Sequence, residues 1–124
     1  MGRQVLLVDD ELALLQGLAP FLEDAGYEVL TAVDARAAMT ILHRHRPEAI
    51  ICDLRLPGME GAEFYDTIQD NPDWCEIPFV FLTGEGEDAV QDRRAAGGVR
   101  RVLTKPFDPE DLVVILGEEV APQP

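Results

Sequence analysis

Apolar positions along the chain follow two alternating patterns. Short runs rich in aliphatic and β-branched residues are typical of strands, and they occur at Gln4–Val8, Glu28–Ala32, Ala49–Asp53, Phe79–Thr83 and Arg101–Thr104. Between them, apolar residues recur every three or four positions, which is the period of an amphipathic helix. Helices are therefore predicted at about Glu11–Ala25, Asp34–Arg46, Gly61–Asp70, Asp88–Ala96 and Pro109–Glu119.

Residues at the ends of these segments support the helix predictions. Asp34 and Asp108 precede two of the helices as N-caps, and Gly26 follows the first helix where a C′ glycine belongs. Pro47 closes the second helix, whereas Pro20 lies inside the first and predicts a kink there.

The order of elements indicates the fold class. The runs Val5–Val8, Ile50–Cys52 and Phe79–Leu82 are continuously apolar, as expected of parallel strands covered on both faces. Strands that alternate with helices predict an α/β domain with right-handed crossovers. A chain of 124 residues that is 47% hydrophobic has the length and core of one domain, which we place at 1–119, with 120–124 as a tail or the start of a linker.

Charge and composition restrict the partners. The chain has 24 acidic and 10 basic residues, a formal net charge of −14, so nucleic acid and anionic membranes are poor partners and proteins or cations are favoured. Apolar runs such as Leu112–Leu116 are far shorter than the ~20 residues that span a bilayer. With no signal-peptide pattern after Met1, and with only Cys52 and Cys75, a cytoplasmic protein without a disulfide framework is expected.

Polar residues follow four of the predicted strands. They are Asp9, Asp10 and Glu11 after the first strand, Asp53 at the end of the third, Thr83 at the end of the fourth, followed by Gly84, and Lys105 after the fifth, followed by Pro106. Each has an ordinary interpretation as a cap, a turn residue or a surface charge. Because ligands bind beyond the carboxyl ends of parallel strands, their convergence on one edge predicts a functional site instead.

The residue types at this edge suit phosphoryl chemistry. Clustered carboxylates repel one another unless a cation lies between them, and oxygen ligands of this kind suit Mg²⁺. A lysine and a threonine hydroxyl can bind phosphoryl oxygens, and an aspartate facing them can accept the group as an aspartyl phosphate.

The same residues carry a resemblance to a known family. The segments Leu6–Glu11, Ile50–Gly61, Phe81–Gly84 and Leu103–Phe107 resemble the motifs of receiver domains of two-component response regulators, the CheY-like group. The resemblance extends from Gln4 to about Glu119. It implies a flavodoxin-like (βα)5 three-layer sandwich whose five-stranded parallel sheet has the order 2-1-3-4-5.

The resemblance also implies roles and partners. Asp53 would be the phosphoacceptor, Mg²⁺ would be held by Asp9, Asp10, Asp53 and the backbone carbonyl of Arg55, and Thr83 and Lys105 would bind phosphoryl oxygens. The Lys105–Pro106 peptide is similar to one that is usually cis in the family. The donor would be a sensor histidine kinase or phosphotransfer protein, and the target a downstream output domain or protein. A phosphorylation-linked homodimer is a further candidate. Such a chain is a signalling module that catalyses its own phosphorylation and dephosphorylation, not a turnover enzyme.

One position departs from the family pattern. Three residues before the lysine the family usually carries Tyr or Phe, whereas this chain has Val102, which cannot act as an aromatic rotamer switch. We therefore expect phosphorylation to be coupled to the face of the fourth helix, fifth strand and fifth helix through movement of the loop Gly84–Asp88 and of the fourth helix. Arg100 and Arg101 would form a positive patch there for an acidic partner.

Three other functions stay open at this point. A haloacid-dehalogenase-like phosphohydrolase needs Asp-x-Asp-x-Thr after the first strand, where this chain has Asp9, Asp10 and Glu11. A flavodoxin-like cofactor carrier needs a phosphate-cradling loop at that place, and a pseudo-receiver would lack part of the acidic and Thr/Lys set. His43 and His45 are predicted only to complement the dipole at the end of the second helix.

Overall fold

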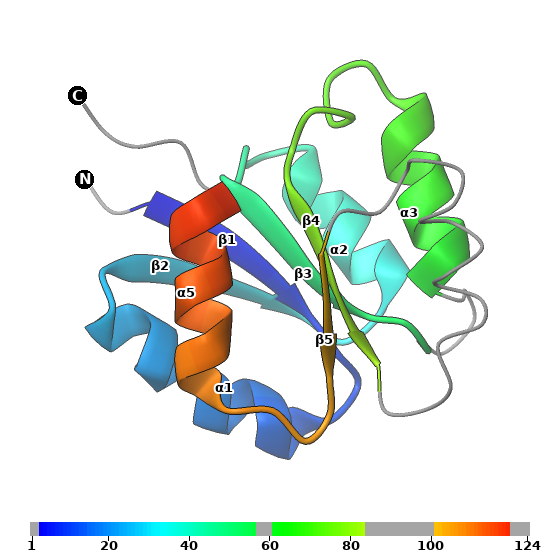
Figure 1. Cartoon of the computed structure of the whole chain (residues 1–124). Helices are drawn as coiled ribbons and strands as arrows, with labels where there is room; N and C mark the ends of the chain where they lie inside the picture. The colour runs from blue at the N-terminus through cyan, green and yellow to red at the C-terminus, as the bar shows by residue number, and fades with distance from the viewer. Residues whose placement is uncertain (1–2, 57–60, 84–100, 120–124) are drawn as a thin grey trace.

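Five parallel strands form one sheet in the order β2-β1-β3-β4-β5, as the resemblance implied (Figure 1). The computed structural model describes residues 3–56, 61–83 and 101–119. Its strands are β1 (Arg3–Val8), β2 (Tyr27–Ala32), β3 (Ala49–Asp53), β4 (Phe79–Thr83) and β5 (Arg101–Thr104). Its helices are α1 (Leu12–Asp24), α2 (Ala35–Leu42), α3 (Gly61–Asp70) and α5 (Pro109–Glu119). The helix predicted at Asp88–Ala96 and the tail at 120–124 lie outside the described residues.

Side chains alternate between the two faces of the sheet and build a core on each. Leu6 and Val8 of β1 point to the face covered by α2 and α3, whereas Val5 and Leu7 point to the face covered by α1 and α5. Figure 1 shows these two helix pairs on opposite sides of the strands. Since β1, β3 and β4 are buried on both faces, their continuous apolar runs follow directly from the three-layer arrangement.

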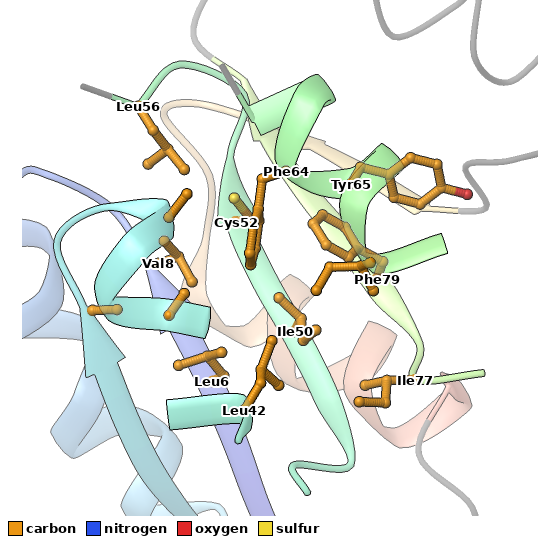
Figure 2. Packing of buried hydrophobic residues seen from close by; sticks show 14 of the residues in the cluster. Leu6, Val8, Leu42, Ile50, Cys52, Leu56, Phe64, Tyr65, Ile77 and Phe79 are labelled. Carbon is orange, nitrogen blue, oxygen red and sulfur yellow. The ribbon is translucent and has the colours of Figure 1, made fainter. Parts of the chain in front are cut away.

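The core under α2 and α3 is rich in aromatic residues. Phe64 and Tyr65 of α3 pack against Phe79 of β4, and the Tyr65 and Phe79 rings meet edge-on with centroids 5.1 Å apart. Cys52 lies within this cluster beside Phe64 (Figure 2). These contacts fix α3 against the strands whose ends carry the polar residues.

The other core joins the two helices that flank the site. Leu15, Leu18 and Leu22 of α1 and Leu112 and Leu116 of α5 are all buried against the opposite face of the sheet. α1 begins at Leu12, directly after the acidic segment that follows β1. Among the described residues, no helix is long and apolar enough to cross a membrane.

The helix ends confirm most of the predicted caps and correct one boundary. The Asp34 carboxylate accepts a hydrogen bond from the Ala37 amide at 2.8 Å, and Gly26 has a φ of 101°, the left-handed conformation of a C′ glycine. The prediction that the second helix reaches Arg46 is wrong, because α2 ends at Leu42. Pro47 disfavours helical geometry in Arg46, the residue before it, and the chain turns toward β3 through residues 43–46.

Candidate phosphoryl-transfer site

Four strand ends meet at one edge of the sheet, and backbone hydrogen bonds hold them together. The Asp9 amide donates to the Ala32 carbonyl at 3.1 Å, so the residue after β1 is tied to the end of β2. On the other side, the Lys105 amide donates to the Thr83 carbonyl at 2.7 Å. The segments that carry the predicted site residues are therefore positioned by the sheet itself.

Three carboxylates lie together at this edge. Asp9, Asp10 and Asp53 each offer an oxygen atom, and these atoms lie within 4.8 Å of one another. Asp9 is fully buried, Asp53 is partly buried and Asp10 is exposed. The cluster thus has an enclosed end and an open end, and the open end is accessible to a hydrated cation.

Neighbouring amides orient two of these carboxylates. Asp9 Oδ1 accepts a hydrogen bond from the Glu11 amide at 2.9 Å, and Asp53 Oδ1 accepts one from the Arg55 amide at 3.2 Å. Glu11 is the N-cap residue of α1, but its side chain makes no capping hydrogen bond. The Glu11 side chain therefore does not cap α1, and the carboxylate that accepts a backbone amide at the start of this helix is that of Asp9.

Lys105 brings a positive charge into the cluster. Its Nζ lies 2.8 Å from Asp9 Oδ2, 3.3 Å from Asp53 Oδ2 and 3.4 Å from Glu11 Oε1. The Lys105–Pro106 peptide is cis, as the resemblance implied. One lysine thus connects the ends of β1, β3 and β5.

The electrostatics of the site follow from burial and these contacts. Burial raises the pKa of Asp53 and the charge of Asp9 adds to the rise, although the Arg55 amide and Lys105 oppose it. Burial alone would lower the pKa of Lys105, but its hydrogen bond with Asp9 and the charge of Asp53 raise it overall. The pKa values of Asp53 and Lys105 therefore depend on whether an additional cation is present.

The donor set fits Mg²⁺. The three aspartates supply hard oxygen ligands, the type that Mg²⁺ takes together with water or phosphate oxygens. Cys52 is a poor ligand for such a site, since burial and the charges of Asp53 and Asp9 raise its pKa and keep it a neutral thiol.

The remaining predicted site residues lie at the same edge. Thr83 is buried at the end of β4, paired in register with Thr104 of β5. Glu11 is a contact to which the sequence assigned no role, and its position directly after Asp10 was the available signal. The sequence therefore identified the members of the cluster but not the pairing of Glu11 with Lys105.

The face of β5 differs from the sequence expectation. Val102 is partly buried against the core under α2 and α3. Arg101 forms an ion pair with Glu118 at 2.7 Å and lies 3.9 Å from Glu119, so its charge is largely balanced within the chain. Arg101 thus does not provide a free positive patch, while Arg100 and the loop Gly84–Asp88 lie outside the described residues.

Comparisons with known proteins agree with this geometry. The family model described as a response regulator receiver domain matches residues 5–117. The phosphate regulon transcriptional regulatory protein PhoB of Pseudomonas aeruginosa is 34% identical over 116 residues, covering 94% of this chain and 51% of that protein. The chain spans about half the length of the curated relatives it matches.

Solved structures extend the similarity to three dimensions. The chemotaxis response regulator CheY4 of Vibrio cholerae superposes with a TM-score of 0.87 at 35% identity, covering 97% of this chain and 100% of that one. The receiver domain of a sensor histidine kinase of Pseudomonas aeruginosa has a TM-score of 0.81 at 28% identity, covering 96% of this chain and 98% of that one. That structure contains a magnesium ion coordinated in its active site cleft.

Proposed function

We propose that this chain, which belongs to the response regulator receiver domain family, accepts a phosphoryl group on Asp53 in a reaction that depends on Mg²⁺. The observation that carries the proposal is the contact of Lys105 Nζ with both Asp53 and Asp9 at the strand ends. A positive group beside an aspartate can stabilise the charge of a transferring phosphoryl group.

Asp53 would act as the nucleophile. Its carboxylate oxygen attacks the phosphorus of a phosphohistidine or of an acyl phosphate, a P–O bond forms, and the bond from phosphorus to the leaving nitrogen or oxygen breaks. Burial favours the neutral acid and raises the pKa of Asp53, whereas the adjacent Lys105 favours the ionised nucleophile. The Arg55 amide and Lys105 thus both favour the charged form of the attacking group, against the effect of burial.

Lys105 and Thr83 would bind the transferred group. The Lys105 ammonium already lies 3.3 Å from Asp53 Oδ2, so it needs only a small displacement to contact a phosphoryl oxygen carried there. Thr83, at the end of the adjacent strand β4, supplies a hydroxyl that can donate to a second oxygen. Both side chains act by neutralising and orienting charge.

Asp9 and Asp10 would hold Mg²⁺ together with Asp53, and the Arg55 backbone carbonyl would complete the protein ligands. When bound, Mg²⁺ neutralises the carboxylates and the phosphoryl oxygens. Because Lys105 Nζ lies 2.8 Å from Asp9 Oδ2, cation binding and the position of this lysine are coupled.

The family is a signalling module, and the finer assignments are part of the proposal. We infer that residues 1–119 form the receiver domain and that a sensor histidine kinase or phosphotransfer protein supplies the phosphoryl group. The chain matches about half of each regulator, so an output domain or a separate target protein is the inferred recipient of the signal. Self-catalysed phosphorylation without substrate turnover distinguishes this function from a phosphohydrolase.

Acetyl phosphate tests the phosphoacceptor. The chain with Mg²⁺ is expected to gain one phosphoryl group by intact-mass analysis, and chelation of Mg²⁺ should prevent the gain. Asp53→Asn should gain none, while Asp70→Asn, which changes an exposed aspartate of α3, should behave as the unmodified chain. Equal labelling of Asp53→Asn and the unmodified chain would exclude Asp53, and absence of labelling in both would favour a pseudo-receiver.

Mg²⁺ binding is tested separately from phosphorylation. Titration followed by amide chemical shifts of residues 9–11 and 53–55 should saturate with a dissociation constant of ~1 mM or below. Asp10→Asn should weaken the binding, whereas Asp24→Asn, an exposed change at the end of α1, should not. Identical titrations for the two variants would contradict the proposed ligand set.

A further inference from the structure

A polar hollow lies at the end of the sheet opposite the aspartate cluster. It has a volume of about 330 Å³ and is lined by residues 42–46, which lead from α2 into β3, and by Asn71, Asp73 and Trp74, which follow α3. Both segments precede strands, so they lie at the amino ends of β3 and β4, and Figure 1 shows them together at one end of the molecule. None of the lining residues belongs to the proposed phosphoryl-transfer site.

The lining concentrates positive and hydrogen-bond-donating groups in an acidic protein. His43, Arg44, His45 and Arg46 are consecutive, and they include both histidines of a chain whose net charge is −14. Because α2 ends at Leu42, these four residues lie in the connection from α2 to β3, where they line the hollow. Their concentration in one wall is therefore a result of the early end of α2.

Specific contacts hold the two walls together. Arg46 Nη1 donates to the Asp73 carbonyl at 2.5 Å, which joins the turn before β3 to the segment after α3. The His43 ring meets the Trp74 ring edge-on, with centroids 5.1 Å apart and an interplanar angle of 65°. Trp74 is itself buried, so the hollow has a fixed base.

Asn71 holds the segment after α3 in place through three hydrogen bonds. Its Oδ1 accepts a hydrogen bond from the Asp73 amide at 2.8 Å, and its carbonyl accepts from the Trp74 amide at 3.0 Å and the Cys75 amide at 2.9 Å. With the side-chain oxygen directed at the Asp73 amide, the NH₂ group of Asn71 can donate to a ligand. The hollow is thus preorganised by bonds between its own walls.

We propose that this hollow binds a small oxyanion, the chemistry shared by a phosphate group and a carboxylate. Arginine presents planar donors that match such oxygens, and the imidazoles and Asn71 add further donors. Two lining features oppose an anion: the Asp73 carboxylate and the negative end of the α2 dipole. The expected dissociation constant at low salt is therefore modest, on the order of 1 mM.

Two probes distinguish the sources of the oxyanion. One is inorganic phosphate and the other is a blocked diglutamate peptide, each added at constant ionic strength without Mg²⁺. Amide and indole chemical shifts of residues 42–46 and 71–74 report binding. Saturation with phosphate alone assigns the site to a phosphate group, and tighter saturation with the peptide assigns it to acidic side chains of a protein; either result supports the proposal.

Opposite charge changes in the two walls sharpen the test. Arg44→Gln is expected to weaken binding roughly three- to fivefold, and Asp73→Asn to strengthen it by a similar factor. The Asp73 contacts to Arg46 and Asn71 use only its backbone, so they survive the second change. Arg36→Gln removes an exposed arginine of α2 that does not line the hollow, and it is the matched control.

Three results would overturn the proposal. The first is a shift that grows linearly with either probe and never saturates. The second is equal behaviour of Arg44→Gln and Arg36→Gln, which would reduce the effect to net charge. The third is a response centred on Asp9 and Lys105, which would place the anion at the aspartate cluster instead.

Discussion

Replacement of Lys105 by methionine tests how the aspartate cluster is stabilised. Methionine keeps much of the length and apolar stem of lysine but removes the ammonium group that lies 2.8 Å from Asp9 Oδ2. Asp9 is fully buried, so the change leaves its carboxylate without a cation, although the hydrogen bond from the Glu11 amide at 2.9 Å remains. Lys105→Met is therefore expected to destabilise the chain when Mg²⁺ is absent.

The magnitude follows from burial. Removal of one partner from a fully buried ion pair costs about 3–5 kcal/mol. The Lys105 side chain is 17% exposed and Asp10 opens the cluster to solvent, so the expected loss lies below that range, at about 2–3 kcal/mol. With a urea dependence of ~2 kcal/mol per molar, the midpoint should fall by roughly 1–1.5 M.

Two dependences identify the cause of the loss. The pKa of Lys105 is raised in the folded chain, so its stabilising contribution is complete below the ordinary lysine pKa and declines as pH rises through the folded value. The difference in free energy of unfolding between the unmodified chain and Lys105→Met should therefore be constant near neutral pH and shrink only in strongly basic solution. Mg²⁺ at ten times its dissociation constant should add about 1.4 kcal/mol to the free energy of unfolding of Lys105→Met, because the ion binds the folded chain.

Urea unfolding followed by the fluorescence of Trp74, the single tryptophan, measures these quantities. Arg36→Met, an exposed arginine of α2, is the control for the change in net charge. If Lys105→Met and Arg36→Met unfold at the same urea concentration, Lys105 does not compensate the buried carboxylate and the argument is refuted.

Three further changes test other parts of the structure. Burial and the Asp9 charge raise the pKa of Asp53, so its ionised form lowers the stability of the folded chain at pH values above the pKa of an ordinary aspartate. Asp53→Asn should therefore add about 0.5–1 kcal/mol to the free energy of unfolding at pH 7, and urea unfolding at several pH values should show that this gain disappears in acid. Gly26→Ala, at a φ of 101° with open space around the added methyl, should cost about 1 kcal/mol in thermal unfolding, whereas Gly17→Ala inside α1 should stabilise. Asp34→Ala removes the N-cap bond to the Ala37 amide and should cost about 1 kcal/mol by the same measurement, with no loss contradicting the capping role.

The strands and most helix ends could be predicted because their signals are local. Ala49–Asp53 and Phe79–Thr83 have the predicted bounds, since a continuous apolar run has few alternatives to a strand buried on both faces. The sequence pattern predicts that the second helix ends at Arg46, four residues later than the end of α2 at Leu42. Residues 43–46 do not oppose helix formation by themselves, and Pro47 together with the connection to β3 decides where the turn occurs.

The residues that make up the site could be predicted from the sequence, but the contacts between their side chains could not. Carboxyl ends of parallel strands meet at one edge, so residues that follow them are brought together by any sheet of this kind. The distances from Lys105 to Asp9 and Glu11 depend on how β5 and α1 are placed across the sheet, which no local pattern contains. The same holds for Arg101, which the sequence left as a free charge and the fold pairs with Glu118.

Local sequence patterns were enough to predict the alternation of strands and helices, the chain's strongly acidic charge and the identity of the residues at the strand ends. These properties depend on the periodicity of neighbouring residues and on composition, so they need no knowledge of distant contacts. The three-dimensional arrangement was needed to show which charges neutralise each other and that residues 42–46 line one hollow together with Asn71 and Trp74. Such pairings join residues far apart in the chain, and their distances are set by strand register and helix packing.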